Sequence, residues 1–491
     1  MGVIGFGFLS LLCFDGYLLL PKPDKQMIPA NLFNDKRLER KSNELITRLS
    51  EKRSCVINQV SQNWAEQISF YRFLNNERVS ECSLQAQIQA KCKSRIPAES
   101  QILIISDTSD FDYSFARKHI KDESGLGYIG NHKGWGYYLH ASLAVNPQDR
   151  SILGMSDAYL WHRSEEKSNF RQSPYHTALS EKESYRWIEA CLRSKPIGEA
   201  AKEVTFIHDS EGDIYDSFLF VPGPGEHLLV RSKHNRRIRT PEGQKSKLYP
   251  YLSSQPCACV YQFEVEANPR NNRTAHTATM ELRYSSVWIE KAAKVCYKYQ
   301  KDYPQSIEVQ AIEVRQQAQS VPEGEDPIHW ILLTTHQIKD FTDAITLVYW
   351  YSLRWIIEDF FRLLKRKGFH LEGSELETGY GLRKLGLVTM QSAIQIMQLR
   401  EARDGESQIP LEEVFSEDEI ESLEKIGPTL EGKTEKLKNP YQPNTLPWAS
   451  WIIARIGGWK GYKSQNPPGV ITYTRGCDRF QDIHRGIQLR I

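Results

Sequence analysis

The stretch "ILIISDTSD", residues 102–110, decides the predicted fold of this chain. A run of apolar residues that is too short for a helix and is closed by polar residues is typical of a strand buried on both faces. Upstream, residues 28–95 are rich in helix formers, whereas the segments downstream have the period of strands. We therefore predict that a sheet begins at Ile102 and that a small helical unit precedes it.

The segments that follow alternate between strand and helix. Two of them alternate apolar and polar residues as a hairpin does, and another is a buried strand that ends at Asp209. One helix is predicted among them, opened by Ser180 with an acidic first turn. This order is that of an α/β layered sheet whose first three strands form an antiparallel meander. The segments are "GWGYYLHASLAV" (134–145), "SILGMSDAYLWHR" (151–163), the helix "SEKESYRWIEACLRS" (180–194), "VTFIH" (204–208) and "LLVRSK" (228–233).

Short alternating runs such as "VYQFEVEA" and "ATMELRYSSVWI" interrupt this rhythm and predict a largely β insertion over residues 235–328. A buried strand, "WILLTT", follows from Trp330, and a helix from about Asp340. Beyond Arg403 the chain is acidic and helical. We predict four parts: an apolar leader (1–27), a helical N-terminal domain (28–95), an α/β domain with the insertion (96–400) and a helical C-terminal region (401–491).

Composition places the chain among globular proteins of two or three domains. Its 491 residues are 40% hydrophobic and 25% charged, which excludes disordered and collagen-like classes. The net charge is only +2, but residues 231–247 hold seven Lys or Arg and residues 411–424 are strongly acidic. A basic strip of this kind binds phosphate backbones or is simply a solvated surface.

The cysteines and the N-terminus bear on location. The nine cysteines are scattered without a zinc pattern or a disulfide framework, which favours a reducing cytoplasm. The apolar leader has no basic n-region, is interrupted by Asp15 and lacks a small-residue cleavage site, so neither a signal peptide nor a membrane span is predicted. We favour a misassigned start, with Met27 or an upstream frame encoding the true beginning.

Three carboxylates are candidates for a metal site. Asp107 and Asp209 each follow a buried strand, at the edge of an α/β sheet where sites are assembled, and Glu358 lies on a predicted helix. Mg²⁺ prefers such oxygen ligands, and two ions about 4 Å apart suit phosphodiester chemistry. An Asp after a strand is also common as a turn or helix cap. Four neighbouring carboxylates stay open as alternatives: Asp110, Asp112, Asp213 and Asp359.

The segment "YSLRWIIEDFFRLLK", residues 351–365, is predicted as one amphipathic helix. At roughly 100° per residue its polar members fall on one narrow stripe about 21 Å long, facing away from the apolar face. Such a stripe is either an ordinary solvated face or a row of phosphate contacts, for which Arg, Lys and Tyr are suited. The stripe consists of Tyr351, Arg354, Glu358 and Lys365, and the apolar face of Leu353, Ile356, Ile357, Phe360, Leu363 and Leu364.

The spacing Tyr351-x-x-Arg354-x-x-x-Glu358-x-x-x-x-x-x-Lys365 resembles the "YREK" signature of the insertion-sequence-four family of bacterial DDE transposases. Blocks similar to that family's occur in order from about Asn31 to the end, among them "FNDKRLER", "NWAEQISFYRFLNN", "SDTSDFDY", "HDSEGDIYD", "VRSKHNRR" and "LPWASWIIARIGGWKGY". The stretch before "NDKRLER" departs from the family pattern, which puts recognition of the transposon ends in doubt.

The resemblance implies a fold and a reaction. The fold is α/β, a ribonuclease-H-like core with a β insertion, plus a helical DNA-binding domain at the N-terminus and a helical dimerisation region at the C-terminus. The reaction is cut-and-paste transposition of an insertion sequence: the terminal repeats are cleaved, with or without a hairpin intermediate, and joined to target DNA. The cofactor is Mg²⁺, with Mn²⁺ as a substitute, in a two-metal site, and the enzyme acts as a homodimer in the bacterial cytoplasm, at the nucleoid.

The resemblance also assigns roles to residues. Asp107, Asp209 and Glu358 are the catalytic, metal-binding triad, and the other three signature residues clamp phosphates of the transposon end. Trp330 is expected to stack on a flipped base. Arg231 is a further phosphate contact, and Lys233, Arg236 and Arg237 are weaker ones.

Two other functions are compatible with parts of the sequence. An inactive or truncated remnant that binds DNA or dimerises without catalysis would account for the unusual leader. A glycoside hydrolase with paired carboxylates is disfavoured, because it gives no role to the Arg, Lys and Tyr of the stripe.

Overall fold

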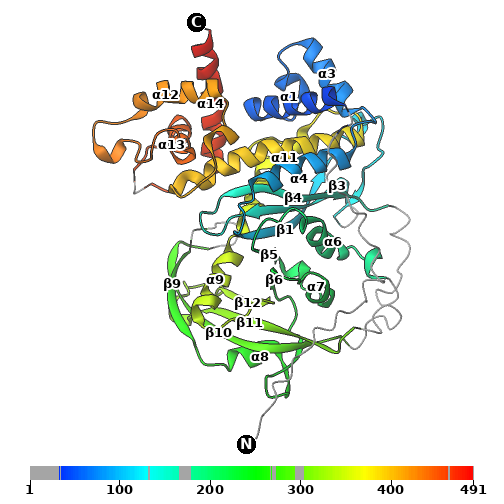
Figure 1. The fold of residues 1–491 in the computed structure, drawn as a ribbon, viewed down its shortest axis with the longest axis vertical. Coiled ribbons are helices and arrows are strands. Elements are labelled where there is room, and N and C mark those ends of the chain that lie inside the picture. Colours follow the sequence, from blue (N-terminus) through cyan, green and yellow to red (C-terminus); the bar gives the residue numbers. More distant parts are fainter. Residues whose placement is uncertain are drawn as a thin grey trace, which may run out of the picture.

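A computed structural model describes residues 33, 35–130, 133–164, 178–265, 267, 273–292, 303–462 and 465–489. The apolar leader, residues 1–27, lies outside this range. Helices from both ends of the chain form one layer, and a long mixed sheet lies beneath it (Figure 1). In the described residues, every helix is too short or too polar to cross a membrane.

The described residues form a 12-stranded sheet that runs from the α/β part into the predicted insertion. Its order is β2-β3-β1-β5-β6-β12-β11-β10-β7-β8, with β4 paired to β3 and β9 to β10. The strands are β1 (Gln101–Asp112), β2 (Gly127–Ile129), β3 (Gly134–Val145), β4 (Ile152–Trp161), β5 (Glu203–His208), β6 (Glu226–Arg231), β7 (Arg237–Arg239), β8 (Lys245–Lys247), β9 (Cys259–Val265), β10 (His276–Glu290), β11 (Ser306–Gln316) and β12 (His329–Thr334).

The meander predicted for the first long strands is present. β1 pairs antiparallel with β3, and β3 with β4, while β5 and β6 run parallel to β1. The prediction that the first strand ends at Asp107 is wrong, because β1 continues to Asp112. The parallel pairing of β1 with β5 ends at Ser106, but its antiparallel pairing with β3 continues to Gly136. This pairing overrides the low strand propensity of "DTSD".

One predicted helix has a displaced start. The helix expected to open at Ser180 begins at Tyr185, because Ser180 lies in a short 3₁₀ turn and Lys182 is extended. The helices are α1 (Lys36–Lys52), α2 (Ile57–Val60), α3 (Trp64–Leu74), α4 (Glu81–Arg95), α6 (Tyr185–Ser194), α7 (Tyr215–Phe220), α8 (Leu248–Ser253), α9 (Phe341–Ser352), α10 (Trp355–Arg362), α11 (Gly379–Glu401), α12 (Glu417–Ile426), α13 (Leu446–Ile456) and α14 (Val470–Gln488).

Helix α11 joins the helical layer to the sheet. It is buried on nearly every side, runs beneath α1, α3 and the C-terminal helices, and has α4 on its other side, against the sheet (Figure 1). Its Arg383 reaches Glu81 on α4 at 2.6 Å and donates to the carbonyl oxygens of Gly125 and Leu160. A buried cation is tolerated only with such partners, so this residue fixes α4 and the sheet to α11.

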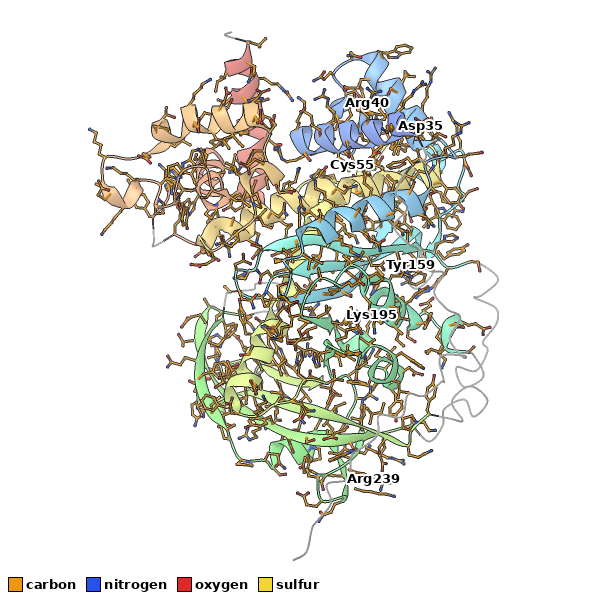
Figure 2. All side chains as sticks on the ribbon, in the orientation of Figure 1. Asp35, Arg40, Cys55, Tyr159, Lys195 and Arg239 are labelled. Carbon is orange, nitrogen blue, oxygen red and sulfur yellow. The ribbon has the colours of Figure 1, made fainter. Side chains whose placement is uncertain are left out.

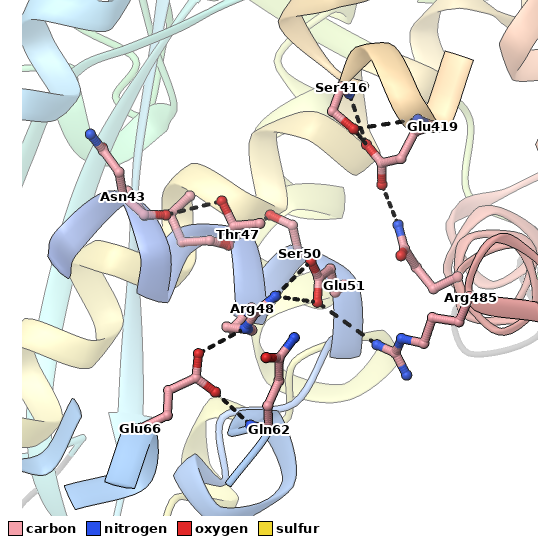
Figure 3. Close-up of polar contacts among 12 residues, drawn as sticks. Asn43, Thr47, Arg48, Ser50, Glu51, Gln62, Glu66, Ser416, Glu419 and Arg485 are labelled. Atoms are coloured by element: carbon pink, nitrogen blue, oxygen red, sulfur yellow. Dashed lines mark hydrogen bonds and ion pairs between the residues drawn. The ribbon is translucent and has the colours of Figure 1, made fainter. Parts of the chain in front are cut away.

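Polar contacts connect the first helix with the last ones (Figure 3). Glu51 on α1 pairs with Arg48 at 3.0 Å and approaches Arg485 on α14 at 3.8 Å. Helix α12 begins with a capping box in which Ser416 and Glu419 bond each other's backbone, and Gln481 of α14 bonds the Glu419 side chain. The first and the last of the described helices are therefore held in one layer.

Candidate active site

The carboxyl ends of the parallel strands bring three predicted site residues to one edge of the sheet. Ser106 on β1 stands opposite His208 on β5, so the next residues, Asp107 and Asp209, emerge side by side. Val230 on β6 stands opposite His208, which places Arg231 beside Asp209. This is the edge where α/β sheets assemble their sites.

The predicted single helix over residues 351–365 is three segments. α9 ends at Ser352, α10 spans Trp355–Arg362, and residues 363–367 form a π-helical turn. At the junction, Arg354 N donates to Tyr351 O at 3.1 Å, and the following bonds keep this three-residue spacing. A tighter turn advances each residue by about 120° instead of 100°, so a single wheel does not describe the whole segment.

The stripe is not a solvated face. Tyr351 is 3% exposed and Arg354 6%, although the wheel turned both away from the packed side. The six residues of the predicted apolar face are buried as expected: Leu353, Ile356, Ile357, Phe360, Leu363 and Leu364.

Arg354 connects two of the three predicted acids. Its Nη1 lies 3.1 Å from Asp107 Oδ2, and its Nη2 donates to Glu358 Oε1 at 2.6 Å. Burial raises the pKa of Asp107 to about 6; Arg354 opposes this rise, while the charges of Asp209 and Glu358 add to it. The charges of Asp209 and Glu358 therefore act on Asp107 at a site that also holds the Arg354 guanidinium, although the three acids come from three separate segments.

An aromatic pair borders this cluster. The rings of Trp330, on β12, and Tyr351 meet edge to face with centroids 5.6 Å apart. Burial raises the pKa of Tyr351 to about 12, so its hydroxyl stays a neutral donor. Within the described residues, the buried Tyr351 hydroxyl and Arg354 Nε have no hydrogen-bond partner. Unsatisfied buried donors are costly, and an anionic oxygen placed here would satisfy both.

Lys365 lies with a different acid. Its Nζ is 2.8 Å from Asp110 Oδ1 and 3.7 Å from Glu372 Oε1, above the Phe111 ring. Asp110, which the sequence left as an alternative to Asp107, is thus engaged by the last residue of the signature. The other open alternatives also have partners: Asp112 caps the turn to Ser114, Asp213 pairs with Arg236, and Asp359 pairs with Arg362 and Arg400.

In the basic strip, residues 231–247, some side chains form ion pairs within the protein and others are exposed. The Arg236 guanidinium is bonded to the buried Asp213 and is therefore not presented to solvent here. Lys233 and Arg237 are exposed, and Arg237 opens β7. Neighbouring Arg239 lies toward the end of the sheet farthest from the helical layer (Figure 2). Only Arg231 of the four predicted contacts adjoins the acids, where its charge acts on Tyr351.

Sequence reasoning did not single out Arg186. Its Nε donates to Thr108 Oγ1 at 3.1 Å, next to Asp107, and its Nη2 pairs with Glu211 at 2.7 Å, two residues after Asp209. An available signal was its position in the first turn of α6, where the helix dipole disfavours a cation. A basic residue there indicates carboxylates nearby.

The side chains at this edge are of the type that a hard divalent cation takes as ligands. The possible ligands are three carboxylates, and a positive charge, that of the Arg354 guanidinium, already lies between Asp107 and Glu358. In the described part of the chain, these three carboxylates do not gather within 4.8 Å of one another. Holding a cation would therefore require the Arg354 side chain to release one of them.

One comparison concerns the N-terminal helices. Residues 28–79 match a protein-family model described as transposase DNA-binding. The match covers α1, α2 and α3 and a few residues outside the described range. The chain therefore carries a region similar to the DNA-binding domains of transposases.

A solved structure also matches, a cryo-EM structure of a piggyBac transposase synaptic complex with hairpin DNA. The match covers 80% of this chain and 72% of that chain, at 8% sequence identity and a TM-score of 0.33. At that score and identity the similarity does not establish a shared fold.

Proposed function

We propose that the chain is a DDE transposase of the insertion-sequence-four family, which cuts transposon ends and joins them to target DNA. One observation carries the proposal: Asp107, Asp209 and Glu358 lie around Arg354, beside a buried Tyr351 hydroxyl and Arg354 Nε that have no hydrogen-bond partner among the described residues. The match of residues 28–79 to transposase DNA-binding domains supports DNA as the substrate.

The fold we propose for the catalytic part is ribonuclease-H-like. Its support is the strand order, an antiparallel meander β4-β3-β1 followed by β5 and β6 parallel to β1. The strands β7 to β11 then occupy the predicted insertion, and α10 returns Glu358 to the edge that carries the two aspartates.

The proposed roles follow from the contacts. Asp107, Asp209 and Glu358 would hold Mg²⁺, or Mn²⁺ in its place, and two such ions activate the attacking oxygen and stabilise the leaving one when bound. Arg354 exchanges a carboxylate for a phosphate oxygen, and Tyr351 donates its hydroxyl to the same group. Trp330 offers its ring to an unstacked base, and Arg231 neutralises the neighbouring phosphate.

The decisive test is cutting of paired transposon ends by purified protein with Mg²⁺. Asp209→Asn and Glu358→Gln are expected to abolish strand cleavage while a gel shift shows end binding unchanged. Asp112→Asn is the matched control, since this acid lies farther along β1 and an amide can still cap Ser114. Normal cutting by either variant, or its loss in the control, would overturn the assignment.

The same experiment separates an enzyme from a remnant. A remnant that only binds DNA or dimerises fails to cut in its wild-type form, whether or not the ends are retarded in the gel. For an enzyme that grips phosphates, binding falls steeply as salt rises, because counterions are released when DNA is bound.

A further inference from the structure

Two histidines and a glutamate converge at the opposite edge of the sheet. Glu203 begins β5, His227 is the second residue of β6, and His336 follows the end of β12. Glu203 and Asp209 stand at the two ends of β5, about 20 Å apart at ~3.3 Å per residue. The cluster is therefore separate from the candidate active site and has no part in the proposed reaction.

The donor atoms lie close enough together to ligate one ion. His336 Nδ1 lies 3.2 Å from Glu203 Oε1, and His227 Nε2 lies 3.3 Å from the same oxygen. One ligand atom from each residue lies within 4.8 Å of the others. In a tetrahedral zinc site with bonds of about 2.0–2.2 Å, neighbouring donors are roughly 3.3–3.5 Å apart. The two measured separations are close to such an edge.

Neighbouring side chains orient these donors. Thr205 Oγ1 is 2.8 Å from His336 Nε2, which leaves Nδ1 facing Glu203. Gln101 Nε2 donates to Glu203 Oε2 at 3.0 Å, which leaves Oε1 facing the histidines. Partners of this kind, which fix a ring and a carboxylate from behind, are characteristic of metal ligands. The two imidazole rings stack with centroids 3.9 Å apart and planes 20° apart, so one ring has to turn before both nitrogens can face a single ion.

Burial suits the same purpose. His336 is 9% exposed, so one member of the set is held away from solvent. The side chains of His227 and Glu203 are 26% and 28% exposed. Water therefore reaches one side of the cluster and can supply a fourth ligand.

We infer that Glu203, His227 and His336 form a binding site for a divalent transition-metal cation, with zinc as the ion that suits two imidazole nitrogens and one carboxylate oxygen. The ion would join the first residues of β5 and β6 to the segment after β12. Those strands carry Asp209, Arg231 and Trp330 toward their other ends. A bound ion stabilises the folded chain by mass action and holds the three strands in register.

The test uses the full chain, stripped with a chelator and titrated with Zn²⁺ in excess Mg²⁺, so that the carboxylates of the active site are already supplied with a hard cation. We expect one Zn²⁺ per chain by metal analysis and a rise in melting temperature. Bound Co²⁺ should give the visible absorption of a four- or five-coordinate site. A near-ultraviolet thiolate band would instead indicate binding at cysteines and would count against the site.

Variants of the cluster show whether its residues bind the Zn²⁺. His227→Ala and Glu203→Gln change half-buried ligands and are each expected to weaken Zn²⁺ binding at least about 100-fold, because the loss of a group that only hydrogen-bonds to a ligand already costs 10- to 100-fold. His329→Ala is the control, since His329 pairs with one carboxylate, Glu313, at 2.9 Å. Unchanged Zn²⁺ binding in His227→Ala and Glu203→Gln, or no binding by the wild type, overturns the inference. Asp209→Asn should still bind Zn²⁺, which separates this result from the outcome at the active site.

Discussion

Arg354 shows how one residue sets the electrostatics of the candidate active site. Its guanidinium is buried, and its pKa is held above the usual value because Tyr351 and three carboxylates outweigh the lowering effect of burial. Removing it would leave Asp107 and Glu358 as neighbouring acids with no cation between them. Breaking a buried pair from one side is costly, whereas an exposed pair contributes little.

We predict that Arg354→Gln lowers the free energy of unfolding by about 3 kcal/mol. Arg362→Gln, which breaks an exposed pair with Asp359 on the same helix, should cost less than about 1 kcal/mol. Urea titrations of both variants measure the difference. Equal losses would mean that Arg354 is solvated in the absence of DNA.

Trp330 is the second residue whose role can be measured by itself. Trp330→Ala is expected to weaken binding of terminal-repeat DNA by roughly 5- to 150-fold, the equivalent of the 1–3 kcal/mol of a base–aromatic stack. Trp330→Phe should recover part of the loss. Fluorescence anisotropy with labelled repeats is the measurement, and Tyr349→Ala, an exposed aromatic on α9, is the control. Unchanged affinity in Trp330→Ala would assign the ring to packing against Tyr351 alone.

Strand β1 shows what decides an element's length. The apolar run "ILIIS" predicts only its first half, and the remaining residues belong to the strand because β3 pairs with them up to Gly136. A glycine is required there: a Cβ at Gly136 would lie 1.9 Å from the carbonyl oxygen of Phe111. The close approach of the two strands therefore depends on a residue without a side chain.

We predict that Gly136→Ala destabilises the chain by about 3 kcal/mol, because the clash is with backbone and no side chain can move away. Gly373→Ala is the control, since a Cβ at that position meets nothing within 4 Å. Thermal melts followed by circular dichroism compare the two. A Gly136→Ala protein with unchanged stability would show that β3 can shift along β1 at no cost.

On the scale of the whole molecule, packing of the sheet against α6 and α9 removes several histidines from water. Burial lowers the pKa of His208 and His336 to about 3 and that of His140 well below its usual range. The unfolded chain binds protons at these histidines below about pH 6.5, whereas the folded chain does not. Their contribution to stability is therefore complete above pH 6.5 and is lost as the pH falls below it.

We predict that unfolding becomes easier between pH 7 and pH 5.5, with roughly 1.4 kcal/mol lost at pH 5.5 for each buried histidine. His140→Gln should reduce that loss by about the same amount, whatever its effect at neutral pH. Urea midpoints at several pH values give the slope. Identical slopes for the variant and the wild type would show that His140 takes up its proton in the folded state.

Local features of this protein can be predicted from the sequence. Apolar runs indicated β5, β6, β12 and the first half of β1, and the polar residues that close two of these runs indicated Asp107 and Asp209. These features depend on neighbours along the chain, so they can be predicted without a structure. The predicted roles of these residues in catalysis and DNA binding stay predictions.

Only the tertiary structure decided which of these residues meet. It extended β1 past Asp107, divided the segment 351–365 into separate turns, and placed Arg354 between two acids and Lys365 beside Asp110. It also brought together Glu203 and His336, which are far apart in the sequence and belong to no motif. Pairing across such distances, and the removal of charges from water, arise from contacts that exist only after folding.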